Sequence, residues 1–418
     1  MKKTISKFYI YLANDSLYRN SIYLMLSTGV TAVFGFLFWI INARLYSAEQ
    51  VGIGTTLISI MTLISSFSLL GLGNSLIKYL STSDKKNEKI NTSFTLVGLT
   101  SIFISIFFLI FLKTFSPRLL FVRESIIFSL LFILFIVFSS LNALSESVFI
   151  AYRSSKFVLI KNTIFSITKL IFPIFLVALG TYGIVVSMGI AMAIAFLVSL
   201  VFLILRFNYL FKPIIDKIVV KRMIKFSLGN YIAGNLGGLP AMALPILITN
   251  IIGAKFSAYF YMDMMIVSLL YIIPMATSQS LFAEGSYSGI ELRVHLKKAL
   301  KIISIIIIPA IIVTFLFGNY ILLAFGKEYS DEGFILLKLL SISGIFISIN
   351  AIGGTILNIK IKIKLLILLS LINTTVILSL SVFFIKMNLF GVVGVGIGWI
   401  VGQGIISVIY LLFIKKLL

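Results

Sequence analysis

Twelve apolar stretches, each long enough to cross a lipid bilayer, dominate this sequence of 418 residues. A helix needs about 20 mainly apolar residues to span the hydrocarbon core, because it rises only about 1.5 Å per residue. The stretches lack the alternating polarity of barrel strands, so the sequence predicts an all-α integral membrane protein. They lie near residues 20–43, 51–77, 91–112, 125–150, 157–179, 183–205, 226–250, 257–282, 302–324, 334–358, 365–385 and 391–413.

The composition excludes several classes of protein and site. With 60% hydrophobic and only 11% charged residues, the chain has more apolar surface than one aqueous core could bury, so it is not a soluble globular protein. It contains no cysteine and one histidine, His295, which excludes thiolate metal sites, cysteine nucleophiles and zinc sites with several imidazoles. We therefore expect no enzymatic activity, no metal and no cofactor, apart from coupling to Na⁺ or H⁺.

The formal net charge of +22 is explained by the orientation of the chain in the membrane. With twelve spans both termini lie on one side, and most of the 35 Lys and Arg residues then fall in the loops of that side, Lys156 and Lys161 among them. Short loops rich in Lys and Arg stay in the cytoplasm. We expect both termini in the cytoplasm, a location in the cytoplasmic (inner) membrane, attraction to anionic membrane lipids and no nucleic-acid partner.

Rare asparagine and glycine residues recur at a constant separation of 208 positions, which indicates an internal duplication. The pairs are Gly29 and Gly237, Asn42 and Asn250, Asn142 and Asn350, and Gly183 and Gly391. Six spans per copy keep both copies in the same orientation, so the sequence predicts two parallel six-helix repeats with a substrate site between them near the middle of the membrane. We expect an N-terminal lobe at 1–206, a cytoplasmic linker at 207–225 and a C-terminal lobe at 226–418.

The seventh span is interrupted by glycine and proline. Proline removes a backbone hydrogen bond and clashes with the preceding turn, so this helix should bend easily. The carbonyl groups that proline frees need partners in the protein or in a water-filled cavity. We interpret the span as a moving gate that lines the cavity, and a static packing kink is the alternative. The gate residues are Gly234, Gly237, Gly238, Pro240 and Pro245.

Few ionisable residues lie within the spans, where a charge is costly and usually faces the bundle interior. Lys169 is near the middle of the fifth span, and we interpret it as a cavity cation that contacts an anionic substrate. The alternatives are an ion pair with a neighbouring acid and a long side chain that reaches the interface. Asp263 in the eighth span could pair with Lys169, bind a coupling cation, or be an interfacial carboxylate. Glu146 and Lys338 lie nearer the ends of their spans.

Polar residues of spans one and seven are further candidates for lining the cavity. They are Asn42, Arg44, Asn230, Asn235 and Asn250. Arg44 lies at the outer end of the first span, where an anchor or loop clamp is the alternative to a ligand.

Two more patterns concern packing. Gly394, Gly398 and Gly402 follow one another at intervals of four residues, which places them on one face of the twelfth span and predicts a close helix contact. The basic stretch Glu284–Lys301 contains regularly spaced apolar residues, Ile290 among them, and predicts an interfacial amphipathic helix.

Short motifs spread over the whole chain resemble the polysaccharide-exporter branch of the MATE-like MOP flippase superfamily. The motifs are Asn20-Ser21, Ala43–Gly52, Leu70–Gly73, Tyr152–Ser154, Lys156-Phe157, Leu179–Gly183, Leu281–Ser286 and Phe325–Tyr329. Lys169 matches a position where members often carry a basic residue. Ala283 departs from the family pattern, since many relatives have proline there, and we expect a straighter end of the eighth span.

The resemblance implies a MATE-like fold whose two lobes rock about a cationic cavity, with bending of spans one and seven. It implies a transporter that flips an undecaprenyl-pyrophosphate-linked oligosaccharide from the inner to the outer leaflet by alternating access, for O-antigen or capsule-like surface polysaccharide. The implied partners are this lipid-linked oligosaccharide, membrane lipids, and the polysaccharide polymerase and chain-length machinery. The resemblance assigns Asp263 no role.

Two other functions fit the same pattern of spans. A multidrug exporter of the same fold would exchange cationic drugs for Na⁺ or H⁺, and it calls for acidic residues deep in the lobes. A membrane glycosyltransferase or polymerase would need catalytic carboxylates or a large outer loop. Here the most central charge is the cation Lys169, and most acids lie in short loops.

Overall fold

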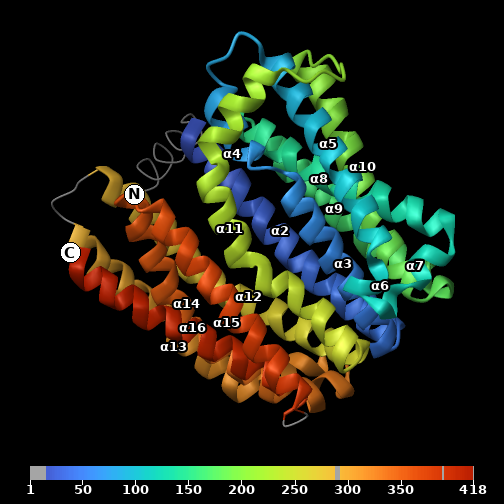
Figure 1. Ribbon diagram of the computed structural model, residues 1–418, viewed down its shortest axis with the longest axis vertical. Helices are drawn as coiled ribbons and strands as arrows, with labels where there is room; N and C mark the ends of the chain where they lie inside the picture. Colours follow the sequence, from blue (N-terminus) through green and yellow to red (C-terminus); the bar gives the residue numbers. More distant parts are fainter. Residues whose placement is uncertain (1–15, 288–291, 388–389, 418) are drawn as a thin grey trace, which may run out of the picture. The chain divides into compact units, whose positions relative to one another are not determined.

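The protein is described by a computed structural model that covers residues 16–287, 292–387 and 390–417. Twelve of the described helices are long and apolar enough to cross a membrane, which confirms the predicted all-α membrane architecture (Figure 1). These spans are Tyr18–Leu45, Ala48–Ser68, Lys86–Ile110, Ile126–Ala151, Lys156–Phe175, Thr181–Phe207, Ser227–Ile251, Ala254–Phe282, Leu292–Leu323, Lys327–Ile359, Ile363–Lys386 and Val393–Lys415.

The chain divides into two compact units. The first comprises Met1–Leu45 and Met61–Leu228, and the second comprises Tyr46–Ile60 and Gly229–Leu418. The helices that belong wholly to the first unit are α2 (Ser16–Leu45), α4 (Leu72–Tyr79), α5 (Lys86–Ile110), α6 (Leu112–Phe115), α7 (Phe121–Glu124), α8 (Ile126–Ala151), α9 (Lys156–Phe175) and α10 (Thr181–Phe207). Those of the second unit are α12 (Ala254–Tyr287), α13 (Leu292–Leu323), α14 (Lys327–Ile359), α15 (Ile363–Lys386) and α16 (Val393–Leu417). Helices α3 (Ala48–Ser68) and α11 (Lys217–Ile251) are divided between the units.

The internal duplication is visible in the helix ends. Helix α8 ends at Ala151 and α14 ends at Ile359, which is 151 + 208. Arg153 and Ile361, the equivalent residues of the turns that follow, both have left-handed backbones with φ of 52° and 55°. The amides of residues 152, 153 and 154 donate to the carbonyls of 148, 150 and 149, and the same bonds recur at 360, 361 and 362. The two repeats therefore terminate this helix with the same hydrogen-bonded turn.

The second span is shorter than predicted. Helix α3 ends at Ser68, and the chain turns at Leu70 and Gly71, whose φ angles are 50° and 73°, before α4 begins. The prediction of one span over 51–77 is therefore wrong in its last part. Hydropathy could not indicate this break, because α4 is itself apolar and buries Leu72 and Leu76 in the core of the first unit.

The connection after α10 is tied to α5 by one asparagine. Asn91 Nδ2 donates to the carbonyl of Leu210 at 2.8 Å, and Asn91 Oδ1 accepts from the backbone amide of Lys212 at 3.0 Å and from the Tyr209 hydroxyl at 2.6 Å. Burial raises the pKa of Tyr209, so its hydroxyl remains a donor at physiological pH. Residues 217–225 of the predicted linker form the first turns of α11.

The basic stretch 284–301 is not a separate interfacial helix, which corrects the prediction. Helix α12 continues to Tyr287, and the next described helix, α13, begins at Leu292 and runs on through the ninth span. Ile290 lies outside the described residues. Leu292 and Ala299 are buried in a cluster with Ile303, whereas Val294 and Leu300 are exposed, so only one side of this stretch packs inside the protein.

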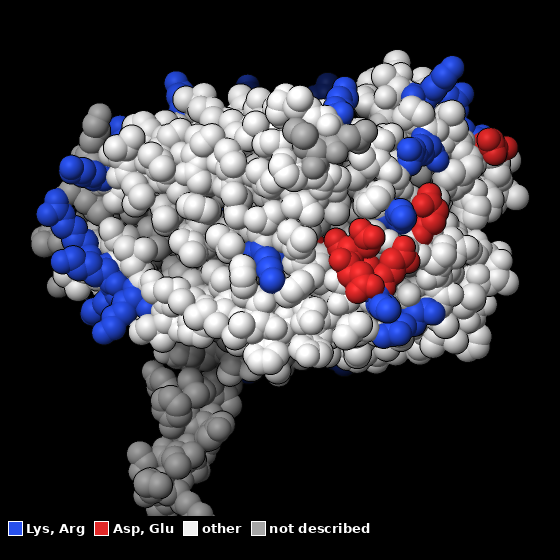
Figure 2. Space-filling view, turned by 90° about the horizontal axis from the view of Figure 1, so that it is seen from below, with Lys and Arg blue, Asp and Glu red and all other residues white. Residues whose placement is uncertain are grey.

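The surface of the spans is largely uncharged. Most of the face in Figure 2 is white, and most of the acidic side chains visible on it gather in one patch. Helix α14 carries three exposed acids in its first turns, Glu328, Asp331 and Glu332, and Tyr259 of α12 donates a hydrogen bond to Glu328. Acidic side chains thus gather at the end of a span, as expected for helices whose middle faces lipid.

The three regularly spaced glycines of α16 face α15, which confirms the predicted close contact. A Cβ atom at Gly394 would lie 2.7 Å from Phe384 Cβ, and one at Gly402 would lie 2.4 Å from Ile377 Cγ1. At Gly398 it would lie 2.7 Å from both the backbone nitrogen and the hydroxyl of Ser381. These distances are too short for any side chain, so the contact depends on glycine.

A methyl group at Gly398 should therefore push α15 and α16 apart. We expect Gly398→Ala to lower the free energy of unfolding in detergent by about 1–3 kcal/mol, because the new atom meets backbone that cannot move aside. Gly404→Ala is the control, since a Cβ there would be 3.7 Å from the nearest Phe346 atoms, which is ordinary contact. Equal stability of the two variants would contradict this packing.

Candidate functional site

Helices α2 and α9 pack side by side in the first unit and run in the same direction. Asn20 Oδ1 accepts from the backbone amide of Ser155 at 2.8 Å, and Asn162 Nδ2 donates to Ser27 Oγ at 2.9 Å. Both bonds join residues 135 positions apart, and a constant difference means that the helices are parallel. The contact between these helices, which we call the α2–α9 seam, carries the polar residues that follow.

Lys169 lies in the α2–α9 seam and is 5% exposed, as predicted for a cation in the bundle interior. Its Nζ is 4.9 Å from the ring centroid of Phe165 and 5.8 Å from that of Phe38. A Cβ atom at Gly35 would lie 3.8 Å from this Nζ, so the ammonium packs against α2 at this glycine. Among the described residues Lys169 forms no ion pair. Aromatic faces stabilise the ammonium only in part, and its charge remains available for an anion.

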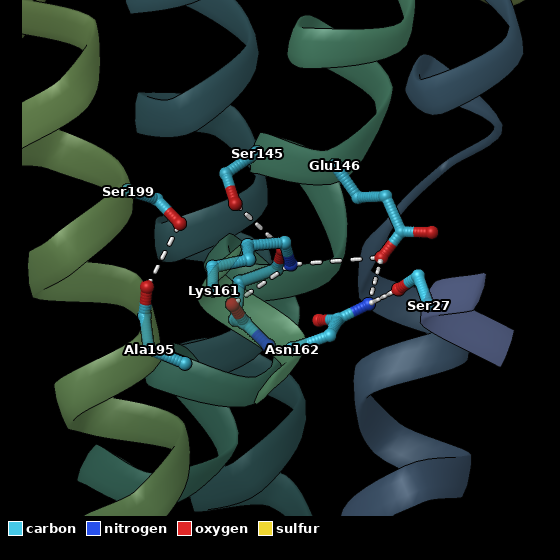
Figure 3. A network of polar contacts seen from close by, with 8 residues as sticks. Ser27, Ser145, Glu146, Lys161, Asn162, Ala195 and Ser199 are labelled. Atoms are coloured by element: carbon cyan, nitrogen blue, oxygen red, sulfur yellow. Dashed lines mark hydrogen bonds and ion pairs between the residues drawn. The ribbon is translucent and has the colours of Figure 1, made fainter. Parts of the chain in front are cut away.

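Lys161, two turns earlier on α9, has the opposite surroundings. Its side chain is buried, with Nζ 3.6 Å from Glu146 Oε2, and it donates to Asn142 O and Oδ1, both at 3.0 Å. Figure 3 shows Lys161 reaching toward Glu146 of α8. Counting Lys161 among the loop cations was therefore wrong. Sequence hydropathy gave no sign of this contact, because the acid and the lysine belong to different helices.

Asn162 completes this cluster and holds Glu146 in place. Its Nδ2 donates to Ser27 Oγ and, at 3.4 Å, to Glu146 Oε2 (Figure 3). Glu146 Oε2 thus faces both Lys161 and Asn162, while Oε1 has no hydrogen-bond partner in the described part of the chain. The Glu146 side chain is 38% exposed, against 1% for that of Lys161. One carboxylate oxygen is fixed and the other is open.

In the second repeat the residues around the equivalent asparagine are uncharged. Asn350, the counterpart of Asn142, donates through Nδ2 to Gln403 Oε1 at 2.7 Å, and its Oδ1 accepts from Ser407 Oγ at 2.9 Å. In the first repeat Ala195 stands where Gln403 would be, and Ser199 donates to the Ala195 carbonyl (Figure 3). Leu369 occupies the position of Lys161. The buried ion pair is therefore a property of the first unit alone.

Asp263 is buried in α12 of the second unit. Neither of its carboxylate oxygens has a hydrogen-bond partner among the described residues. A Cβ atom at Gly333 of α14 would lie 3.1 and 3.2 Å from these oxygens, so this glycine makes room for the carboxylate. An ionised carboxylate is costly to bury without partners.

The two candidates on α2 differ in burial. Asn42 is buried one turn beyond Phe38, donates through Nδ2 to the Phe38 carbonyl at 2.7 Å, and has no partner for Oδ1 among the described residues. Arg44 lies exposed in the last turn of α2. Asn42 thus keeps a buried oxygen without a partner among the described residues, whereas Arg44 is exposed at the helix end.

The candidates on α11 lie in the second unit. Asn230 is exposed, Asn235 donates to the Tyr231 carbonyl at 3.0 Å, and Asn250 is half-buried near the end of the helix. A Cβ atom at Gly234 or Gly237 would meet nothing within 4 Å, and one at Gly238 would touch only Met242, at 3.8 Å. The roles of these residues in ligand binding and gating stay predictions.

Helix α11 continues through Pro240 and Pro245. Pro240 has no amide hydrogen for the carbonyl of Leu236 one turn earlier. The Thr374 hydroxyl of α15 donates to this carbonyl instead. The freed carbonyl has thus found the protein partner that the sequence led us to expect.

The Thr374 bond should matter only because position 240 is a proline. We expect Thr374→Val to lower the free energy of unfolding by about 1–3 kcal/mol, since it leaves a part-buried carbonyl unpaired. In a Pro240→Ala background the new backbone amide can serve that carbonyl, so Thr374→Val should cost less than about 0.5 kcal/mol. Chemical denaturation in detergent micelles measures both values, and an equal cost in both backgrounds would contradict the assignment.

Among the described residues no three or more His, Cys, Asp or Glu side chains come together as a metal-binding cluster.

Comparison with solved structures shows which fold this is. An inward-facing multidrug resistance MATE transporter of the MOP superfamily has a TM-score of 0.74 at 14% identity, covering 95% of this chain and 97% of its own. The lipid II flippase MurJ, inward closed, has a TM-score of 0.75 at 17% identity, covering 94% and 87%. A MOP transporter from Pyrococcus furiosus, whose reverse binding-pocket polarity suggests a different function, has 0.65 at 15% identity, covering 97% and 96%.

The sequence itself matches a protein family. No curated protein matches the chain in sequence. The profile of the polysaccharide biosynthesis protein family matches residues 17–282, which is 266 of 418 residues. The resemblance drawn from the short motifs is confirmed: the chain belongs to the polysaccharide biosynthesis protein family and has the MOP-superfamily fold.

Proposed function

We propose that the protein flips a polyprenyl-(pyro)phosphate-linked oligosaccharide from the inner to the outer leaflet of the cytoplasmic membrane by alternating access. The product would serve a cell-surface polysaccharide such as O-antigen or capsule. The observation that carries this proposal is Lys169, a buried ammonium that forms no ion pair in the described part of the chain. Membership of the polysaccharide biosynthesis family and the fold shared with a lipid II flippase support it.

The chemistry of the substrate explains why a buried cation is needed. A pyrophosphate and its sugars cannot enter hydrocarbon unaided, because removing charge from water costs tens of kcal/mol by idealised estimates. The Lys169 ammonium would replace part of that hydration, while the polyprenyl chain stays in lipid. No bond is made or broken, so transport needs binding and conformational change but no catalytic group.

Topology and partners complete the proposal. The excess of Lys and Arg in the loops on one side supports cytoplasmic termini, and the Lys161–Glu146 pair would then lie in the cytoplasmic half of α9. The polysaccharide polymerase and chain-length machinery would receive the flipped product at the outer leaflet.

A cation-coupled multidrug exporter is the second candidate, and Asp263 is the observation that favours it. MATE transporters share the fold, and a buried acid without partners could attract a cationic drug or its counter-ion. Lys169 opposes this candidate, because an ammonium repels cationic drugs. We assign Asp263 to binding H⁺ or Na⁺ in the flippase cycle, because its carboxylate is buried and has no hydrogen-bond partner among the described residues.

Replacing Lys169 tests the proposal. We expect Lys169→Met to reduce transport of a fluorescent polyprenyl-pyrophosphate-linked disaccharide in proteoliposomes at least ~10-fold, equivalent to about 1.4 kcal/mol of lost interaction. Lys338→Met is the matched control, since Lys338 is also an intramembrane lysine over phenylalanine rings, 3.9 and 4.9 Å from two centroids. Wild-type transport by the Lys169 variant would remove the basis of the proposal.

Replacing Asp263 tests ion coupling. Asp263→Asn keeps the size of the side chain but removes its negative charge and its titratable proton, so the response of transport to either gradient should be lost or strongly reduced. Glu328→Gln, at an exposed acid of α14, should leave the response intact. Transport rates with and without an imposed gradient give the answer, and an unchanged response in the Asp263 variant would exclude this role.

A further inference from the structure

We infer that Glu146 and Asn162 form a sugar-binding subsite that takes an uncharged, hydroxyl-rich sugar next to the phosphate held by Lys169. This inference rests on the proposed function and specifies how the head group lies along the α2–α9 seam. The Glu146–Asn162 subsite was not apparent from the sequence, because its residues come from α8, α9 and α2.

The helical geometry aligns the subsite with Lys169. Asn162 and Lys169 are seven residues apart on α9, which is close to two full turns, so both side chains leave the same face. Their separation along the axis is about 10 Å, given a rise of ~1.5 Å per residue. A pyrophosphate with its first sugars covers such a distance. Both residues also face α2, through Ser27 and Gly35.

The open atoms of the subsite can only accept hydrogen bonds. Glu146 Oε2 is held by Lys161 and Asn162, which leaves Oε1 open. An ionised carboxylate only accepts hydrogen bonds, so the Asn162 side chain must turn its Nδ2 toward Glu146. Asn162 Oδ1 then remains as a second open acceptor. Two acceptors held by fixed neighbours suit a ligand that donates twice, as neighbouring sugar hydroxyls do.

The charges of the cluster select against an acidic sugar. Lys161 neutralises Glu146 overall, but the lysine is buried and the carboxylate is the group that a ligand would meet. A carboxylate on the sugar would face Glu146 with a like charge and would weaken binding. An acid in a membrane span is costly and usually faces a water-filled cavity or the bundle interior. The Glu146 side chain is 38% exposed, which fits a position at a water-filled cavity.

Binding of three short-chain probes tests the subsite on the full-length protein in nanodiscs. The probes are nerylneryl pyrophosphate alone, the same lipid carrying glucose, and the same lipid carrying glucuronic acid. We expect the wild type to bind the glucosyl probe at least ~5-fold more tightly than the bare pyrophosphate, and the glucuronosyl probe more weakly than the glucosyl one. Glu146→Gln and Asn162→Ala should each bring the ratio of glucosyl to bare affinity to about one.

Controls separate the subsite from the fold and from the proposed function. Ser199→Ala removes a hydroxyl that bonds only within α10, so the ratio should stay at its wild-type value. Asn162→Ala keeps the Lys161–Glu146 pair, so it tests the subsite even if Glu146→Gln fails to fold. An unchanged ratio in the folded variants overturns the subsite. Failure of the wild type to bind bare nerylneryl pyrophosphate would instead contradict the role of Lys169 and thus the proposed function.

Discussion

The free-energy cost of placing a charge inside a membrane is the main constraint on this structure. Helix α9 carries two buried lysines whose surroundings differ. Lys161 is paired with Glu146 and bonded to Asn142, so its charge is neutralised within the first unit. Lys169 has only aromatic rings around its ammonium among the described residues. A cation buried in a span is costly, and under the proposed function an anionic ligand would supply the missing partner. The account of function depends on this difference.

The two repeats share a scaffold but differ in the residues around the equivalent asparagines: Lys161 corresponds to Leu369, and Ala195 corresponds to Gln403. The same hydrogen-bonded turn closes α8 and α14, with Arg153 and Ile361 in the same left-handed conformation. Nine residues before each helix end lies an asparagine: Asn142 accepts a hydrogen bond from Lys161, and Asn350 donates one to Gln403. A charged pair in one repeat and a neutral pair in the other place the polar chemistry in the first unit, and the buried Asp263 belongs to the second.

Much of the fold could be predicted from the sequence, because a bilayer requires long apolar helices and a repeat of rare residues marks a duplication. The burial of Lys169 and the glycine contact of α16 were predicted for the same kind of reason: each depends on positions along one helix. The Lys161–Glu146 pair, the break at Leu70 and the fate of residues 284–301 depend on how a helix is rotated or interrupted, which hydropathy does not report. The roles of Asn230, Asn235 and Asn250 stay predictions.

The most direct test of the central claim is mass spectrometry of the lipids that copurify with the protein. If Lys169 is the cation for an anionic lipid-linked glycan, the wild type should retain a polyprenyl-pyrophosphate-linked oligosaccharide, and the Lys169→Met variant, purified in the same way, should have lost it. Retention of the same glycolipid by both proteins, or of ordinary phospholipids alone by the wild type, would contradict the account.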